Sequence, residues 1–214
     1  MFIALQPIVN AEIKSTFGFE VLARNSADST SFVPPPPHHI FWSNIDKQAI
    51  VQSDRHLQCS RHVFVNVSET TLADDFLFTA WCRAIKQRAR KGQMVIEITE
   101  LVSDHTLSQR WGHIKELGVQ LSLDDYGKHF NGMNRLERYQ WDYCKLEMHQ
   151  QLGLTNECVI ALEQCRDRSI EVIAERVETA QHANQAISCG IHLQQGYFWG
   201  RPELAQAPLA MVAE

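Results

Sequence analysis

Acidic and amide side chains recur at the ends of short apolar runs along this chain, at roughly the spacing of a β/α repeat. Runs such as Met94–Ile96, which precedes Glu97, are typical of buried strands, and charges are rarely left unpaired inside a core. The pattern therefore predicts strands whose ends bring these groups together, and it favours a shared metal-binding cluster. The series consists of Glu20, Asn66, Glu97, Asp124, Asp125, Lys145, Glu175 and Gln195.

The spacing of the apolar residues predicts an alternation of strands and helices along most of the chain. Gly92, Gly118 and Gly190 each follow an expected helix, where a left-handed C-terminal cap favours glycine, and Thr179 can cap the last expected helix. The expected strands are 2–9, 17–24, 62–67, 93–98, 119–124, 142–147, 170–175 and 191–196. The expected helices are 40–59, 72–90, 105–117, 133–138, 155–168 and 179–189.

Such alternation predicts parallel strands joined by helical crossovers, with an antiparallel hairpin at the start. The number of strands fits a modified TIM-type (β/α)₈ barrel, an α/β fold, with an irregular first strand. We expect one domain over residues 1–214, since the chain shows no linker. An open doubly wound sheet is the competing architecture. The barrel is favoured because it would gather the polar strand ends around one mouth, whereas an open sheet would spread them along a crevice.

Composition narrows the classes of partner. The formal net charge of −5 gives no global attraction to a nucleic acid polymer or to an anionic membrane. The first residues carry neither a basic region nor a long apolar stretch, so no membrane segment or signal peptide is expected. The six cysteines include no C-x-x-C pair. Free thiols in a reducing cytoplasm are therefore expected, and with them a cytoplasmic location.

Asp124 and Asp125 are the sharpest local feature. Two adjacent acids at the end of a strand repel each other unless a positive charge lies between them. A divalent cation is a common solution, and oxygen ligands suit Mg²⁺ or Mn²⁺. Two such ions about 4 Å apart can support in-line attack on phosphorus, for which Lys145 could hold a water molecule. The alternative treats each acid singly, as a helix cap, a solvated turn or a strand-end ion pair.

Motifs along the whole chain resemble the EAL-domain family of cyclic di-GMP phosphodiesterases. The family signature Glu-Ala-Leu appears here as Glu20-Val21-Leu22, and later blocks match in order. These blocks are Val65-Asn66-Val67-Ser68, Glu97-Ile98-Thr99-Glu100, Asp124-Asp125-Tyr126-Gly127, Asp142-Tyr143-Cys144-Lys145, Ala174-Glu175-Arg176-Val177-Glu178-Thr179 and Gln195-Gly196-Tyr197.

The resemblance implies a modified (β/α)₈ barrel that hydrolyses cyclic di-GMP to linear pGpG with Mg²⁺ or Mn²⁺ in a two-metal site. It implies that Lys145 positions the attacking water and that Glu175 and Gln195 complete the shell around it. It further implies that Gln6 and Arg24 contact the dinucleotide and that Glu100 anchors the loop after Asp125. A homodimer is left open. The implied metal ligands are Glu20, Asn66, Glu97, Asp124 and Asp125.

Two departures from the family pattern affect the expected activity. The loop after Asp125 carries Lys128 and His129 where the family has Thr and Gly. Lys128 could pair with Glu100 or compete for the negative charge of the site. Arg176 replaces a family glycine and could pair with Glu175 and pull it away. We therefore expect weak or conditional hydrolysis, with a non-catalytic receptor for cyclic di-GMP or for a protein partner as the alternative.

Overall fold

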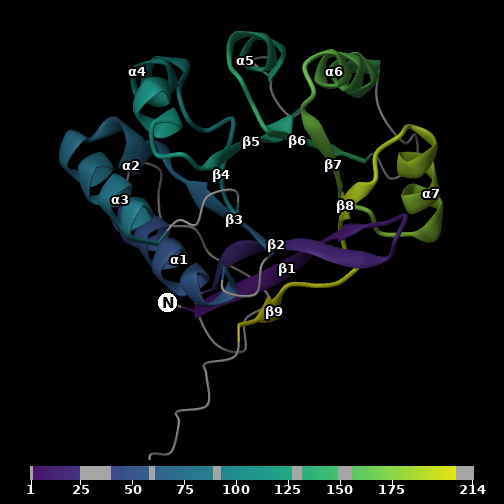
Figure 1. The fold of residues 1–214 in the computed structure, drawn as a ribbon, viewed down its shortest axis with the longest axis horizontal. Helices are drawn as coiled ribbons and strands as arrows, with labels where there is room; N and C mark the ends of the chain where they lie inside the picture. Colours follow the sequence, from purple (N-terminus) through teal and green to yellow (C-terminus); the bar gives the residue numbers. More distant parts are fainter. Residues whose placement is uncertain are drawn as a thin grey trace, which may run out of the picture.

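The computed structural model contains a closed barrel of strands surrounded by helices (Figure 1). The structure describes residues 2–24, 40–57, 61–88, 93–126, 132–148 and 156–205. The strands are β1 (Phe2–Asn10), β2 (Ser15–Arg24), β3 (His62–Val67), β4 (Met94–Ile98), β5 (Gln120–Tyr126), β6 (Tyr143–Glu147), β7 (Glu171–Glu175), β8 (Leu193–Gln195) and β9 (Glu203–Leu204). The helices are α1 (Phe41–Leu57), α2 (Glu69–Ala73), α3 (Asp75–Arg88), α4 (Asp104–Lys115), α5 (Gly132–Arg138), α6 (Asn156–Asp167) and α7 (Ala180–Ser188).

The sheet order runs β2-β3-β4-β5-β6-β7-β8-β1 and closes by pairing of β1 with β2. Pairing is parallel from β2 to β8, whereas β1 is antiparallel to both of its barrel neighbours. This confirms the expected barrel with an irregular first strand and excludes the open sheet. Helices cover the outside of the parallel strands, while β1 and the short β9 form a side that Figure 1 shows without a covering helix.

Alternation along the strands explains how apolar and polar layers stack inside the barrel. Six buried side chains form a separate cluster in the interior: Ile8, Phe64, Val95, Tyr143, Ile173 and Leu193. Because side chains two residues apart point to the same face of a strand, Asn66 follows Phe64 and Glu97 follows Val95 on the interior side. Lys145, Glu175 and Gln195 follow their own apolar partners in the same way. The polar layer therefore lies directly above an apolar floor.

The main hydrophobic core fills the layer between the strands and the surrounding helices. It includes large side chains with no exposed surface, such as Trp81, Ile85, Leu72 and Leu107.

Gly118 and Gly190 have φ of 70° and 76°, which confirms them as left-handed residues after helices. Gly92 lies outside the described residues. The hydroxyl of Thr179 accepts a hydrogen bond from His182 N, so the expected cap of α7 is confirmed as well.

Two elements differ from the sequence-based expectation. The single helix expected over 72–90 is two helices, α2 and α3, separated at Asp74, whose backbone is extended (φ −95°, ψ 125°). Asp74 breaks the helix because its carboxylate accepts a hydrogen bond from Leu77 N at 2.9 Å and so caps a new one. Strand β9, which was not expected, pairs with Ala4 and Leu5 of β1.

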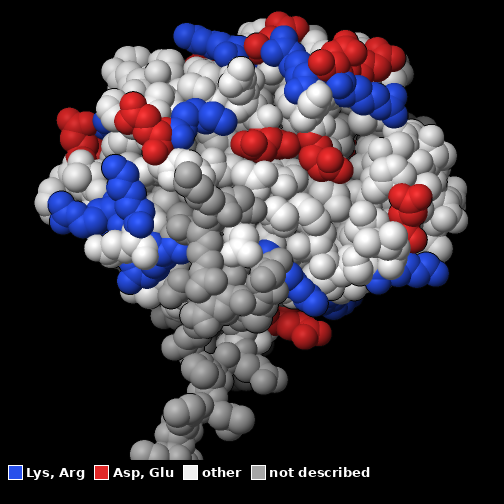
Figure 2. Space-filling model, viewed as in Figure 1, with Lys and Arg blue, Asp and Glu red and all other residues white. Residues whose placement is uncertain are grey.

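Charges on the surface do not separate into basic and acidic faces in the view of Figure 2, where Lys and Arg lie among Asp and Glu. No helix within the described ranges combines the length and apolar character needed to cross a membrane. The five cysteines that the structure describes are free thiols.

Candidate active site

The ammonium group of Lys145 lies at the centre of four carboxylates at the carboxyl end of the barrel. Its Nζ is 2.9 Å from Glu97 Oε1, 3.0 Å from Asp124 Oδ1, 3.0 Å from Glu175 Oε1 and 3.3 Å from Glu20 Oε2. These groups come from strands β6, β4, β5, β7 and β2. The barrel therefore brings together five of the residues that the sequence predicted as one cluster.

Two amides complete this cluster. Asn66 Nδ2 donates hydrogen bonds to Glu20 Oε1 and to Glu97 Oε2, both at 3.2 Å. Gln195 Nε2 donates to Glu20 Oε2 at 2.7 Å. Glu20 thus receives two amide donors and the ammonium group, which fixes its orientation. Asn66 and Gln195 are also brought into the site, as the sequence predicted.

Burial and mutual charge shift the protonation equilibria of the cluster. Burial and the nearby Glu20 raise the pKa of Glu97 well above its ordinary value, although Lys145 opposes this shift. Burial alone would lower the pKa of Lys145, but attraction to the four carboxylates outweighs it and leaves this pKa well above its ordinary value. Four carboxylates share one ammonium group, so negative charge outweighs positive charge in the cluster and attracts further cations.

The donor set fits a divalent ion that prefers oxygen ligands. Glu97 Oε1 and Asp124 Oδ1 are buried beside the Lys145 ammonium, and Gln195 Oε1 is buried without a hydrogen-bond donor among the described residues. Such oxygens suit a hard cation such as Mg²⁺ or Mn²⁺. In the described part of the chain, no three acidic, His or Cys side chains already converge as ion ligands. The carboxylates do not converge on one empty point, because the Lys145 ammonium lies between them.

Gln6 and Arg24, the expected substrate contacts, lie on the hairpin beside this cluster. Gln6 pairs with Glu20 across β1 and β2, and its Nε2 donates to Gly200 O at 3.5 Å. Arg24 is mostly buried, and its Nη1 donates to Ala23 O at 2.7 Å. Burial lowers the pKa of Arg24, whereas Glu20 and Tyr197 act in the opposite direction. The structure therefore places Arg24 within the electrostatic reach of both the carboxylate cluster and the segment after β8.

One sequence-based expectation is wrong. Arg176 does not draw Glu175 out of the site, because its Nη1 pairs with Glu147 Oε1 while Glu175 stays 3.0 Å from Lys145. Arg176 has a φ of 55°, a left-handed backbone that is uncommon outside glycine, and its side chain is exposed. The departure from glycine therefore leaves the site intact at this position.

Two expected site residues, Glu100 and Asp125, remain. Glu100 lies in the turn after β4 and is partly exposed. The Asp125 side chain and the whole segment 127–131, with Lys128 and His129, lie outside the described residues. The predicted Glu100–Lys128 ion pair therefore lies outside them too.

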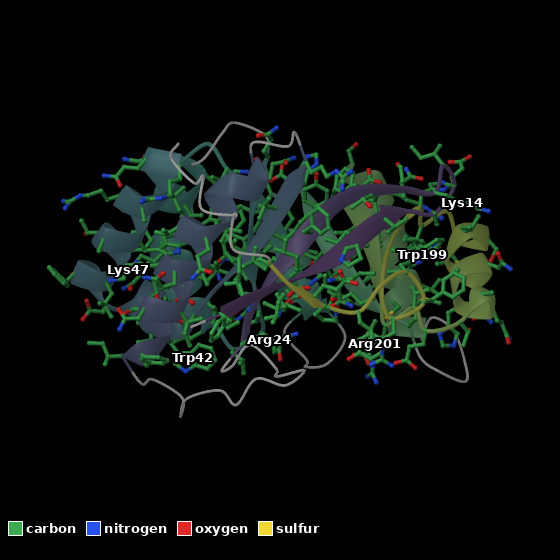
Figure 3. The ribbon with its side chains drawn as sticks, turned by 90° about the horizontal axis from the view of Figure 1, so that it is seen from below. Lys14, Arg24, Trp42, Lys47, Trp199 and Arg201 are labelled. Carbon is green, nitrogen blue, oxygen red and sulfur yellow. The ribbon has the colours of Figure 1, made fainter. Side chains whose placement is uncertain are left out.

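The segment that follows Gln195 had no expected role in the site. There the guanidinium of Arg201 lies 4.2 Å from the ring centroid of Tyr197, and both lie beyond the last barrel strand. Figure 3 shows Arg24 and Arg201 toward the same edge of the barrel, with Lys14 of the β1–β2 turn toward the opposite edge. The sequence did indicate that this segment lies near the site, because Tyr197 follows Gln195 by only two residues.

The model of the EAL domain family matches residues 1–202. This chain belongs to the EAL domain family. Three relatives from Escherichia coli are similar to this chain. One, named "Probable cyclic di-GMP phosphodiesterase PdeN", is 25% identical over 230 residues, which cover 94% of this chain and 43% of that protein. The cyclic di-GMP phosphodiesterase PdeR is 27% identical over 178 residues, covering 78% and 27%. The cyclic di-GMP phosphodiesterase PdeF is 25% identical over 224 residues, covering 94% and 30%. The chain thus spans less than half the length of these relatives.

Solved EAL structures share the fold. The manganese and cyclic di-GMP complex of Klebsiella pneumoniae BlrP1 superposes with a TM-score of 0.79 at 22% identity, covering 95% of this chain and 56% of that one. The EAL domain of Mycobacterium smegmatis DcpA gives a TM-score of 0.77 at 19% identity, covering 95% and 92%. At these identities the likeness establishes the barrel architecture.

Proposed function

We propose that this EAL domain hydrolyses cyclic di-GMP to linear pGpG with Mg²⁺ or Mn²⁺. The observation that supports it best is the buried ammonium of Lys145 among Glu20, Glu97, Asp124 and Glu175. That arrangement concentrates negative charge at the mouth of the barrel. Two relatives of this chain, PdeR and PdeF, are named as cyclic di-GMP phosphodiesterases. The BlrP1 structure contains manganese and cyclic di-GMP.

Each residue has a distinct task in this proposal. The metal ligands would be Glu20, Asn66, Glu97, Asp124 and Asp125. Bound divalent ions would supply electrostatic stabilisation of the phosphate and a more acidic water molecule. Lys145 and Glu175 hold and orient the attacking water, and Gln195 keeps Glu20 in place through the 2.7 Å hydrogen bond. Gln6 and Arg24 bind the dinucleotide, because a guanidinium can hold a phosphate through two hydrogen bonds.

The reaction forms a bond from the water oxygen to phosphorus and breaks the bond from phosphorus to the 3′ oxygen. The 3′ oxygen leaves with a proton, and the phosphate remains on the 5′ side. Cyclic di-GMP is therefore opened to pGpG. A cytoplasmic location and a single domain over residues 1–214 are part of the same proposal.

The competing proposal is a receptor that binds cyclic di-GMP without hydrolysing it, or that binds a protein partner. The loop with Lys128 and His129 favours it, because this loop departs from the family pattern just after the block Asp124-Asp125-Tyr126-Gly127. The same departure leads us to expect slow turnover if the domain is an enzyme.

Chromatography separates the two proposals. The protein is incubated with cyclic di-GMP and Mg²⁺ or Mn²⁺, and the products are resolved over time. Conversion to pGpG that is absent in Glu20→Ala supports the phosphodiesterase. Tight binding by calorimetry without conversion supports the receptor. A turnover equal to that of a relative with the family loop would contradict the expected slow activity.

A further inference from the structure

A buried arginine outside the carboxylate cluster connects the strands that carry it. Arg135 of α5 is 3% exposed, and its guanidinium contacts the segment after β4 at three points. Its Nε donates to Asp104 Oδ1 at 2.7 Å, its Nη1 donates to Thr99 O at 3.1 Å, and its Nη2 donates to Val102 O. An arginine with all of its contacts on one turn holds that turn rigidly, because the guanidinium is planar and its donors have fixed directions.

The backbone of Arg135 makes a second connection. Its carbonyl oxygen accepts a hydrogen bond from the indole Nε1 of Trp141 at 2.9 Å. Trp141 is buried and lies four residues before Lys145 on the segment that enters β6. Arg135 thus joins the turn that follows Glu97 to the segment that precedes Lys145.

Strand pairing alone does not fix the position of Asp124, which β5 carries between β4 and β6. The last pair between β4 and β5 is Ile98 with Leu123, one residue before Asp124. The pairing of β5 with β6 is irregular between Leu123 and Tyr126. Asp124 therefore lies where the strand pairing of the barrel lapses on both sides, and its 3.0 Å ion pair with Lys145 is a contact from outside that pairing that helps to hold it.

We propose that Arg135 is a positioning residue that sets the spacing of Glu97, Asp124 and Lys145 by binding α5 to the turn over residues 99–104. It touches neither the ions nor the nucleotide. It acts through Thr99 and Val102, which follow Glu97, and through Trp141, which precedes Lys145. Residues behind a metal site often change ion affinity or activity by about 10- to 100-fold when they are replaced. The catalytic readout rests on the proposed phosphodiesterase function.

The test compares Arg135→Met and Arg135→Lys with Arg138→Met, whose exposed side chain lies on the same helix. Calorimetry with Mn²⁺ alone measures ion affinity, and hydrogen exchange measures the amides of residues 99–104. We expect Arg135→Met to weaken Mn²⁺ binding by about tenfold, to speed exchange across this turn and to lower kcat more than it raises KM. Arg135→Lys should restore part of each effect, since it keeps the charge near Asp104 without the fork of donors. Arg138→Met should match the unmodified protein.

The outcomes separate positioning from plain stabilisation. A folded Arg135→Met protein with unchanged Mn²⁺ affinity and kcat would overturn the proposal, even if its melting temperature fell. If Arg135→Met does not fold, Arg135→Lys decides in the same way, with an expected loss of about threefold or more in ion affinity. Mn²⁺ affinity and hydrogen exchange need no nucleotide. A protein that never hydrolyses cyclic di-GMP would therefore refute the proposed function and leave this test valid.

Discussion

The Nζ of Lys145 lies 2.9 Å from Glu97 Oε1, and both side chains are enclosed, with 1% and 0% of their surface exposed. A buried ion pair is costly to break, because the remaining partner keeps its desolvation penalty without the attraction that offset it. Lys145 also compensates part of the charge on Glu20, Asp124 and Glu175. The stability of the metal-free barrel and its chemistry therefore depend on the same side chain.

Replacing Lys145 by methionine should lower the free energy of unfolding of the metal-free protein by about 3–5 kcal/mol. Four carboxylates would then face one another without a cation. Urea unfolding in the presence of a chelator measures the change. Lys115→Met is the control, since the Lys115 side chain is 36% exposed and should cost less than about 1 kcal/mol. Equal losses for the two variants would show that Lys145 does not compensate the cluster.

Replacing Glu97 by glutamine should separate stability from ion binding. The side chain is fully buried, and the substitution removes, at nearly constant volume, one of the four carboxylates that share a single ammonium group. We expect the metal-free protein to be as stable or up to about 1 kcal/mol more stable, while stabilisation by Mn²⁺ is lost. Thermal unfolding with and without Mn²⁺ tests this, with the exposed Glu163→Gln as the control. A full Mn²⁺ shift in Glu97→Gln would remove Glu97 from the set of ion ligands.

Gly196 should tolerate no side chain. Its φ is 155°, and a Cβ atom there would lie 2.3 Å from Val177 N and from Val177 O. Gly196→Ala should therefore cost more than about 3 kcal/mol or prevent folding, and any folded protein should show a displaced Gln195. Chemical unfolding gives the cost. Gly112→Ala in α4 is the matched control, because no atom lies within 4 Å of the new Cβ and the helix should gain about 0.5–1 kcal/mol. Similar effects at both glycines would contradict the steric argument.

Asp46 should make the stability of the protein depend on pH below neutrality. Its carboxylate accepts hydrogen bonds from Ser68 N at 3.1 Å and Ser68 Oγ at 2.6 Å, but burial raises its pKa from 3.8 to about 6. The folded state therefore holds the proton more tightly than the unfolded state. The resulting stabilisation is fully present below about pH 4 and is lost as pH rises through about 6, a change of about 2–3 kcal/mol.

Asp46→Asn should flatten the stability profile between about pH 4 and 6, and the exposed Asp167→Asn should not. Urea unfolding at a series of pH values provides the comparison. A profile for Asp46→Asn that keeps the slope of the unmodified protein would assign the dependence to other groups.

Trp199 should stabilise the segment after β8 through one hydrogen bond. Its indole Nε1 donates to Gln194 Oε1 at 2.9 Å, and Gln194 Nε2 donates to Ala183 O at 3.0 Å (Trp199 is labelled in Figure 3). Trp199→Phe leaves the fully buried Gln194 oxygen without that donor, which should cost about 1–3 kcal/mol. A double-mutant cycle with Gln194→Met measures the coupling. A coupling energy near zero would show that the two side chains do not stabilise each other.

The sequence predicted the barrel well because short apolar runs that alternate with helical segments are local properties of the chain. The apolar residue that precedes each polar one by two positions, as Val95 precedes Glu97, assigns both to the interior of one strand. Gly118 and Gly190 at helix ends and the Thr179 cap are equally local features, and they were confirmed. The break at Asp74 was missed because hydrophobic periodicity continues across α2 and α3, while the competing cap depends on a single hydrogen bond.

The sequence by itself determined which polar groups stand at the strand ends and that strands alternate with helices, because both follow from spacing along the chain. Only the tertiary structure decided how those groups pair. Lys145 meets Glu20 across 125 positions of sequence, Arg176 turns to Glu147 rather than Glu175, and Arg135 holds the turn after β4. Such choices depend on side-chain directions and on distances of a few ångströms between distant segments, which no spacing in the sequence specifies.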